Sequence, residues 1–382
     1  MKIDRVQAFI LGNPWKNWIL VKVETDQGHA GWGEATTGLT TMPAFSAVGE
    51  IARLFLGRDP RELQRNWQDA HKALYLTNDG AVLAAMAGIE TACWDIVGKE
   101  LGLPLYRLLG GLAQPRIRTY ANGWYQDERD PARFAERTKQ VAAKGYSALK
   151  FDPLGHNYRT LDRAERRRTI ALVEAVRTAL PDDVDMILEF HDRLTVPEAL
   201  SLIRDLAQFR PLWVEDPVYS SDVAAFAHVC RESPVRIAGG ERFSMPRQFA
   251  ELFAHSRADM VLPEYLRLGG LTRLRQAAAI AEAHNAMVSP HQAQSPLGTA
   301  VNVHFDVATP NAFIQECFDS FHVDWAKDVF GNIPEVQPDG CLVPSEAPGH
   351  GVSVNEAEIA KHPYGERNFM NLFSAGWEKR NS

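Results

Sequence analysis

Three glutamates, Glu189, Glu215 and Glu241, follow one another at intervals of 26 residues, and each comes at the end of an apolar run. The runs read ILEF, LWVED and VRIAGGER. One strand–helix unit of a parallel barrel takes about 25 to 30 residues, so this spacing predicts one carboxylate on each of three successive strands. We expect the side chains to converge at the C-terminal mouth of the barrel, where such folds carry their active sites.

Three carboxylates that meet in this way need a cation, because like charges at close range oppose ionisation. Oxygen ligands favour Mg²⁺, with Mn²⁺ as an alternative, over zinc, which usually takes histidine and cysteine. The sequence therefore predicts a divalent metal site formed by the three glutamates. The competing interpretation is that they are surface or salt-bridged acids on unrelated strand ends.

A candidate general base comes two strand–helix units after the last of these strands, 50 residues after Glu241. His291 follows VSP and precedes QAQSPLG, which is typical of a strand end that turns into a loop. Histidine suits proton abstraction near neutral pH, and a carboxylate on the adjacent strand would fix its tautomer. Glu264 lies 27 residues earlier and can occupy that strand. We expect these two residues to form a catalytic pair, although a structural histidine in the core would leave the same pattern.

Two more polar pairs follow strand ends. His191 lies two residues after Glu189, so the alternation of a strand predicts that both point to the metal site. A protonated imidazole there can deliver a proton to a departing hydroxyl, or it can merely hydrogen-bond the substrate. On the preceding strand, we expect Lys150 to polarise a substrate carboxylate or to pair with Glu189, and Asp152 to accept hydrogen bonds from sugar hydroxyls. A structural salt bridge is the alternative for both.

The elements that must position these residues begin with an α+β capping domain, predicted for residues 1–118. The first 35 residues predict a β-hairpin and a third short strand, and residues 43–112 have helical spacing. The loop LGNPWKNW joins the first two strands. Its tryptophans, Trp15 and Trp18, are expected to line the substrate pocket or to pack the cap against the barrel.

Strands and helices alternate over residues 119–335, which predicts a (β/α)₈ barrel that carries the metal and catalytic residues. Residues 336–382 are rich in glycine and proline and are expected to return to the cap. The predicted fold class is therefore α/β, a modified TIM barrel with an N-terminal α+β capping domain. The eight predicted strands read RTYANGW, ALKFDP, DMILEF, LWVEDP, VRIAGGE, ADMVLPE, AMVSPH and AFIQEC.

Composition narrows the class of protein. The 382 residues are 45% hydrophobic and 23% charged, as in an ordinary globular protein, and the net charge of −7 argues against nucleic-acid binding. We find no apolar run near the roughly 18 residues of a membrane span and no signal peptide. Four scattered cysteines without a CxxC pattern favour reduced thiols. The sequence thus predicts a cytoplasmic enzyme with neither a nucleic-acid nor a membrane partner.

Several motifs resemble the enolase superfamily, in its mandelate-racemase-like branch. They are GIETACWDIVGKELGLPLYRLLGG in the cap, then LEFHDR, WVEDPV, GGERF and SPHQAQSPLG, in the order and spacing of that branch. The resemblance covers essentially the whole chain. Within the branch, the histidine of LEFHDR is similar to that of sugar-acid dehydratases that act on galactonate or mannonate.

The resemblance implies a role for each matching residue. The three glutamates would bind Mg²⁺, His291 would be the base held by Glu264, and His191 would be the acid that expels a hydroxyl. Glu316 in FIQEC would contact the carboxylate end of the substrate. Relatives assemble as dimers or octamers, so a homo-oligomer is implied as well.

Two departures distinguish this chain from the family pattern. Glu189 and Glu264 stand where most relatives carry aspartate, and the second barrel strand reads Lys150-Phe151-Asp152 where a racemase would end in a catalytic lysine. Because aspartate cannot replace that lysine, a two-base racemase is disfavoured.

These observations favour Mg²⁺-dependent dehydration of a sugar acid, either an aldonate or an aldarate. The base would take the C2 proton, the resulting enediolate would be stabilised, and loss of the C3 hydroxyl would give a 2-keto-3-deoxy acid. An epimerase or cycloisomerase acting on a related acid is the alternative, with Lys150 as its second partner. A barrel that has lost catalysis and serves only in binding is a third hypothesis.

Overall fold

The computed structural model describes residues 1–38, 40–126 and 129–377. The N-terminal part is an antiparallel sheet in the order β1-β2-β3, with helices packed against one face. It confirms the predicted α+β cap. Its elements are β1 (Ile3–Leu11), β2 (Trp18–Thr25), β3 (Ala30–Glu34), α1 (Thr41–Ala52), α2 (Leu63–Ala73), α3 (Gly80–Leu101) and α4 (Leu105–Leu108).

Helix α3 is the core of the cap. By length and composition alone it could cross a membrane, which corrects the expectation that no apolar stretch reaches that length, but most of it is buried inside the protein. It packs against β3 so closely that a Cβ atom added at Gly33 would lie 2.1 Å from the carbonyl oxygen of Gly88. Because this apolar surface is covered within the subunit, it is not available as a contact between subunits.

Eight parallel strands form the barrel, and each overlaps a segment predicted to be a strand. Strands β11-β4-β5-β6-β7-β8 form one sheet, and β9-β10 form a separate pair. The amide of Leu262 donates to the carbonyl of Gly239, and the amide of Phe313 donates to that of Val288, which joins the pair to the sheet on both sides. The strands are β4 (Ile117–Ala121), β5 (Ala148–Phe151), β6 (Asp185–Glu189), β7 (Trp213–Glu215), β8 (Ile237–Ala238), β9 (Met260–Val261), β10 (Met287–Val288) and β11 (Gln315–Cys317).

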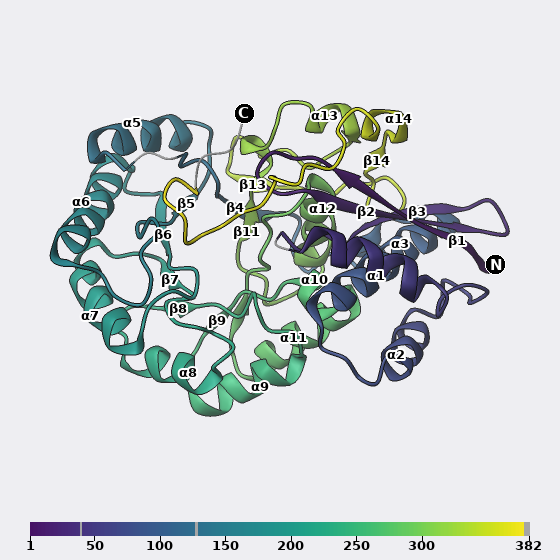
Figure 1. Cartoon of the computed structure of the whole chain (residues 1–382), viewed down its shortest axis with the longest axis horizontal. Coiled ribbons are helices and arrows are strands. Elements are labelled where there is room, and N and C mark those ends of the chain that lie inside the picture. The colour runs from purple at the N-terminus through teal and green to yellow at the C-terminus, as the bar shows by residue number, and fades with distance from the viewer. Residues whose placement is uncertain (39, 127–128, 378–382) are drawn as a thin grey trace.

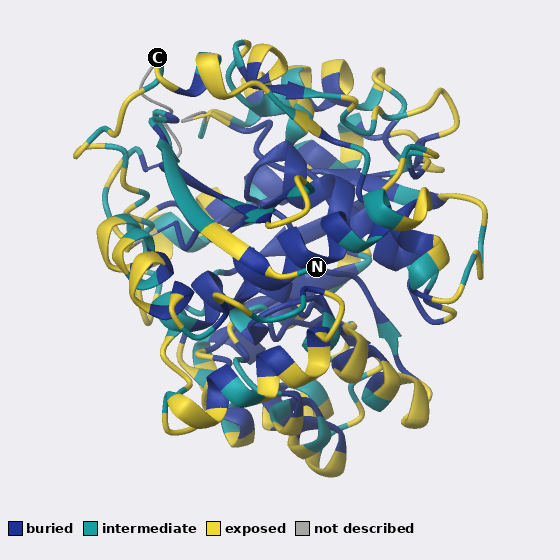
Figure 2. Ribbon diagram, turned by 90° about the vertical axis from the view of Figure 1, so that its right-hand side faces the viewer, coloured by how far each residue is buried: buried dark blue, intermediate teal, exposed yellow. Residues whose placement is uncertain are grey.

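The barrel helices bury one face and expose the other, and α5 to α9 form an outer rim around the strands (Figures 1 and 2). Helix α12 differs, because every residue in it is buried between β11 of the barrel and α4 and β3 of the cap. The barrel helices are α5 (Pro131–Ala142), α6 (Arg163–Ala179), α7 (Val196–Leu206), with η1 (Ala207–Phe209), α8 (Val223–Glu232), α9 (Pro246–His255), α10 (Tyr265–Leu268), α11 (Leu271–Ala283) and α12 (Pro296–Val307).

A separate cluster of buried side chains fills the barrel interior, so the barrel is a packed core and not a pore. Seven of the eight strands, or a residue next to them, contribute to the cluster, and Met287 of β10 packs against it. Polar chemistry is therefore confined to the ends of the strands. The cluster consists of Tyr120, Ala148, Ile187, Trp213, Ala238, Met260, Leu262 and Ile314.

The C-terminal segment connects the two parts of the molecule. Strand β13 pairs with β4 of the barrel, and the amide of Gly12 in the cap donates to the carbonyl of His362 at 2.8 Å. The division into residues 1–118, 119–335 and 336–382 stays a prediction, although β4 begins within two residues of the first boundary. The remaining elements are η2 (Asp319–Phe321), α13 (Ala326–Val329), β12 (Phe330–Gly331), β13 (Cys341–Leu342), β14 (Ser353–Val354) and α14 (Glu356–Ile359).

Candidate metal centre and active site

The three glutamates meet at the mouth of the barrel. Glu189 and Glu215 are the last residues of β6 and β7 and are direct partners in the parallel ladder. Glu241 is the third member of the group. Each of the three glutamates offers a carboxylate oxygen, and these oxygens lie within 4.8 Å of one another. The 26-residue spacing therefore does bring the three side chains together.

Glu241 reaches the group by a different route from the other two. Strand β8 ends at Ala238, and the chain turns through Gly239 and Gly240, where φ is +102°. A Cβ atom at Gly239 would lie 2.0 Å from a carboxylate oxygen of Asp216, so only glycine fits there without displacement. The two glycines thus carry Glu241 past the end of its strand and over the metal centre.

Lys150 lies among the carboxylates below the mouth. Its side chain is 1% exposed, and Nζ lies 2.5 Å from Glu215 Oε1 and 2.7 Å from Glu316 Oε1. A third carboxylate oxygen, from Glu189, lies 3.4 Å away. Burial lowers the pKa of Lys150, but the adjacent carboxylates outweigh burial and raise it well above its ordinary value. The side chain is therefore a permanent ammonium.

One ammonium does not balance this group of carboxylates. Burial raises the pKa of Glu189 to about 7, and burial together with the charge of Glu189 raises the pKa of Glu215 well above its ordinary value. Carboxylates that resist ionisation in this way indicate that positive charge is lacking at the site. Because all of the donors are oxygens, the group fits Mg²⁺ or Mn²⁺.

His291 lies between two carboxylates. Nδ1 is 3.2 Å from Glu264 Oε2, and Nε2 is 3.1 Å from Glu241 Oε2. Burial lowers the pKa of the imidazole, but the charges of Glu241, Glu316 and Glu264 outweigh burial and raise it to about 9. Gln294 Nε2 donates to the second oxygen of Glu264 at 3.0 Å. The carboxylate is thus held from both sides, and Nε2 is the nitrogen that faces the metal centre.

His191 enters the same cavity from the opposite side, but not through strand alternation. Strand β6 ends at Glu189, and His191 has φ of +47°, so the side chain is directed by a turn. Its amide donates to Glu189 Oε1 at 2.6 Å, which ties the turn to a candidate metal ligand. Nδ1 lies 2.6 Å from Asp152 Oδ2, which leaves Nε2 for the cavity.

Two predicted substrate contacts need correction. Asp152 is buried, and its carboxylate is occupied by His191, by the guanidinium of Arg193 and by the amide of Leu154. It holds the histidine and does not face sugar hydroxyls. Arg193 is the counter-charge of this carboxylate.

Glu316 is likewise enclosed and does not line the cavity. Asn122 Nδ2 donates to its Oε1 at 2.7 Å, next to the ammonium of Lys150, and the amide of Gln292 donates to its Oε2 at 2.8 Å. With both oxygens occupied by the protein, Glu316 positions Lys150 and is not placed to contact a substrate carboxylate.

The two tryptophans of the cap loop have different surroundings. Trp15 lines the cavity and stacks on Phe318, with ring centroids 4.8 Å apart. Trp18 begins β2, is fully buried, and packs edge-on against Trp325 and Phe330. Trp18 therefore packs the cap against residues 325–330, which follow the last barrel strand, and it is not among the residues that line the cavity.

Lys16, which lies between these tryptophans, was not identified as a site residue from the sequence. It lines the cavity, is 2% exposed, and has no carboxylate within 4.0 Å of Nζ among residues 1–38, 40–126 and 129–377. Burial lowers its pKa to about 8, although Glu264 and Glu34 act in the opposite direction. Its position in the loop LGNPWKNW was the available signal. For Trp377, which also lines the cavity, the sequence offered none.

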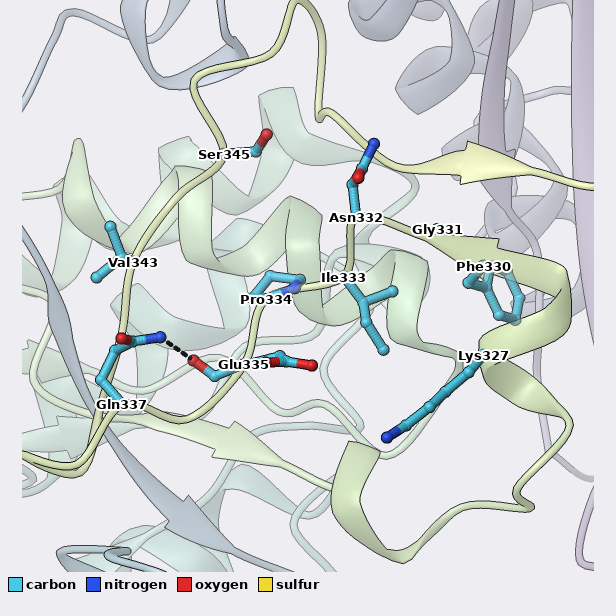
Figure 3. Close-up of a pocket in the computed structure, with 10 residues that line it drawn as sticks. All are labelled: Lys327, Phe330, Gly331, Asn332, Ile333, Pro334, Glu335, Gln337, Val343 and Ser345. Carbon is cyan, nitrogen blue, oxygen red and sulfur yellow. Dashed lines mark hydrogen bonds between the residues drawn. The ribbon is translucent and has the colours of Figure 1, made fainter.

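The cavity at the mouth is narrow, about 70 Å³, and is identified by its chemistry and not by its size. A larger hollow of about 560 Å³ lies beside β12 (Figure 3). Its ten lining residues include only two charged side chains, Lys327 and Glu335, and no histidine. It therefore lacks the groups that acid–base or metal chemistry requires.

Comparison with known proteins agrees with this geometry. Residues 13–110 match the N-terminal domain of the mandelate racemase / muconate lactonizing enzyme family, and residues 133–358 match the family described as enolase C-terminal domain-like. A D-gluconate dehydratase from Thermoproteus tenax is 36% identical over 91% of this chain and 70% of its own length. A D-gluconate/D-galactonate dehydratase from Picrophilus torridus is 30% identical over 98% of this chain and 97% of its own length.

Solved structures show the same architecture. A putative dehydratase from Mesorhizobium loti superimposes with a TM-score of 0.89 at 28% identity, over 96% of this chain and 99% of its own. A mandelate racemase/muconate lactonizing enzyme from Jannaschia sp. CCS1 also has a TM-score of 0.89, at 27% identity over 96% and 98% of the two chains. The chain therefore belongs to the enolase superfamily, in the mandelate racemase / muconate lactonizing enzyme family.

Proposed function

We propose that this chain is a metal-dependent hydro-lyase that removes water from a sugar acid, an aldonate or an aldarate, to give a 2-keto-3-deoxy acid. The observation that carries the proposal is the placement of two histidines around one carboxylate cluster. His291 lies beside Glu241, and His191 is tied to Glu189, so both reach the same cavity. An elimination needs a base and an acid together, and this pair supplies them.

His291 acts first, as the base. A cation held by the three glutamates would offset the charge of Glu241, which raises the pKa of His291, and would so favour the neutral imidazole. Nε2 then accepts the proton from C2 of the substrate, while Glu264 accepts a hydrogen bond from Nδ1 and stabilises the imidazolium that forms. Gln294 keeps the carboxylate in place. The added methylene of glutamate, compared with the family's aspartate, is accommodated, since the two groups lie at hydrogen-bonding distance.

His191 then acts as the acid. Nε2 donates a proton to the C3 hydroxyl, which leaves as water when the C3–O bond breaks. Asp152 orients the ring through its contact with Nδ1. The enol left by the elimination gains a proton at C3 and loses the C2 hydroxyl proton, which gives the keto acid. One water is released, and no oxidant or reductant is needed.

The remaining charges serve the substrate carboxylate. Glu189, Glu215 and Glu241 would hold Mg²⁺ or Mn²⁺, and a bound divalent cation supplies positive charge that offsets the negative charge developing on the substrate. Lys150 adds a fixed ammonium below the same region. Lys16, which reaches the cavity from the cap, is placed to bind oxygen atoms at another point of the sugar acid.

An epimerase or cycloisomerase is less well supported by the geometry. It would need Lys150 as the second base, but this ammonium is paired with two carboxylates at 2.5 and 2.7 Å. Because their charges raise its pKa well above the ordinary value, it has no free electron pair with which to accept a proton.

A homo-oligomer and a cytoplasmic location remain predictions.

The test is a screen of aldonic and aldaric acids with purified protein and Mg²⁺, in which 2-keto-3-deoxy products are detected with semicarbazide. His291→Asn and His191→Asn are run beside the parent protein. We expect a product that needs metal and disappears in both variants. In heavy water, His191→Asn should still exchange the C2 hydrogen, whereas His291→Asn should not. Exchange without any product in the parent protein would favour an epimerase and refute the dehydratase.

A further inference from the structure

We propose that Trp377, in the C-terminal segment, is a positioning residue for the acid His191 and forms part of the substrate cavity. This inference rests on the proposed function. The segment is far from the catalytic strands in the sequence, yet it returns to the mouth of the barrel (Figure 1). Met370, Leu372 and Trp377 all line the cavity that contains the two histidines.

The first link is direct. The indole ring of Trp377 lies perpendicular to the imidazole of His191, with ring centroids 5.4 Å apart. Trp377 is 7% exposed and is itself held by Gly155, whose carbonyl accepts the indole N–H at 3.0 Å. A perpendicular arrangement of this kind is favourable and also limits rotation of the smaller ring. The indole therefore forms a wall against which the imidazole rests.

The second link runs through the partner of His191. The guanidinium of Arg193 donates to the same carbonyl of Gly155, and it also pairs with the carboxylate of Asp152. It also donates to the carbonyl of Phe190 at 3.2 Å and to the carbonyl of Leu372 at 3.4 Å, the latter again in the C-terminal segment. The carbonyl of Gly155 therefore accepts hydrogen bonds from both Trp377 and Arg193, and Arg193 is the partner of Asp152. Displacement of the C-terminal segment would disturb His191 both through the indole ring and through Asp152.

The base is held by different elements. His291 is fixed by Glu264, which follows β9, and by Glu241, which follows β8. Among the described residues, no hydrogen bond or ion pair joins this pair to residues 370–377. Loss of Trp377 should therefore impair transfer of a proton to the leaving group while proton abstraction at C2 continues.

The experiment compares Trp377→Ala with the parent chain in the presence of Mg²⁺ and the substrate identified in the screen. A misplacement of about 1 Å costs about 100-fold in rate, so we expect kcat for product to fall about 10- to 100-fold, with C2 exchange in heavy water within about twofold of the parent. Trp377→Phe retains a ring beside His191 and should recover most of the lost rate. Equal losses of exchange and elimination would reduce Trp377 to a general structural role and overturn the proposal.

Phe373→Ala is the matched control. Phe373 lies in the same segment, is 51% exposed, and packs on Tyr158 instead of on the cavity. It should leave both reactions unchanged. If Trp377→Ala does not fold, as judged by circular dichroism, Trp377→Leu carries the test, because it retains apolar volume but has no aromatic ring. A kcat-to-exchange ratio of Trp377→Leu equal to that of the parent would then overturn the proposal.

A measurement without substrate separates this inference from the proposed function. The ring current of an adjacent indole shifts the imidazole signal of His191 in an NMR spectrum of histidine-labelled protein, and His191→Asn assigns that signal. We expect the signal to move in Trp377→Ala and to stay in Phe373→Ala. An unmoved signal would show that Trp377 does not contact His191, whatever reaction the enzyme performs.

Discussion

Replacing Asp152 with asparagine distinguishes a residue that holds the acid from one that binds the substrate. The carboxylate lies 2.6 Å from His191 Nδ1 and also neutralises Arg193, which is buried beside it. Asparagine has the same shape but no charge. The variant should lose the charged contact that orients the His191 ring, whereas contacts with the substrate should be unchanged.

The size of the effect follows from these contacts. A hydrogen bond to a charged group contributes about 1.5–3 kcal/mol, and each 1.36 kcal/mol in the barrier is a factor of ten, so kcat should fall about 10- to 150-fold. Breaking a buried ion pair costs about 3–5 kcal/mol in stability, so the urea unfolding midpoint should also fall. KM should stay within about twofold of the parent value.

The assay is steady-state dehydration with the semicarbazide readout, at a temperature where circular dichroism shows the variant to be folded. C2 exchange in heavy water is measured in parallel and should persist, because His291 is untouched. A variant with an unchanged kcat and a strongly raised KM would refute this reasoning. That result would restore the sequence-based expectation that Asp152 binds sugar hydroxyls.

Three further predictions concern the metal centre and the cap. In the metal-free protein, the raised pKa of Glu189 (about 7, from an ordinary 4.5) and of His291 (about 9, from 6.5) mean that the folded state binds more protons than the unfolded state. The free energy of unfolding should therefore decrease as pH rises from about 5 to about 9, and Mg²⁺ should restore about 2.7 kcal/mol at 100 times its dissociation constant. Urea titrations at several pH values, with EDTA or with Mg²⁺, check this prediction. A free energy of unfolding that is independent of pH would count against the charge imbalance. Gly239→Ala forces a methyl group against Asp216 and should lower the free energy of unfolding by about 1–3 kcal/mol. It should also weaken Mg²⁺ binding, as measured by calorimetry. Gly49 has open space around it, so Gly49→Ala should change neither quantity. Lys16→Met should raise KM at least tenfold with a smaller effect on kcat, and Lys16→Arg should retain part of the affinity; an unchanged KM would exclude Lys16 from the substrate site.

Much of the fold was predictable from local patterns. Each barrel strand is a short apolar run followed by a helix of 3.6-residue period, so both the number and the order of strands could be read along the chain. Helix α3 shows the limit, because its composition is that of a membrane span and only its packing against β3 identifies it as the core of the cap. Composition reports how apolar a segment is, but not what covers it.

The candidate site was likewise only partly predictable from the sequence. Glu189, Glu215, Glu264 and His291 could be placed because strand–helix units of nearly constant length bring the ends of parallel strands to one mouth. His191 was placed there too, but through alternation, whereas the structure directs it by a turn with positive φ. The period of a strand stops applying at the residue where the strand ends.

The sequence by itself determined which carboxylates are candidate metal ligands, the count of barrel strands and the presence of two histidines near the strand ends, because these depend on residue identity and on regular spacing. Only the tertiary structure decided which carboxylates are open to the cavity. Asp152 and Glu316 are already occupied by Arg193, Asn122 and Lys150, and these contacts span up to 194 residues of sequence. Likewise, Lys16 from the cap and Trp377 from the C-terminal segment become neighbours of the barrel mouth only when the chain folds back over it. Spacing predicts where a side chain starts, whereas its partners depend on long-range packing that leaves no period in the sequence.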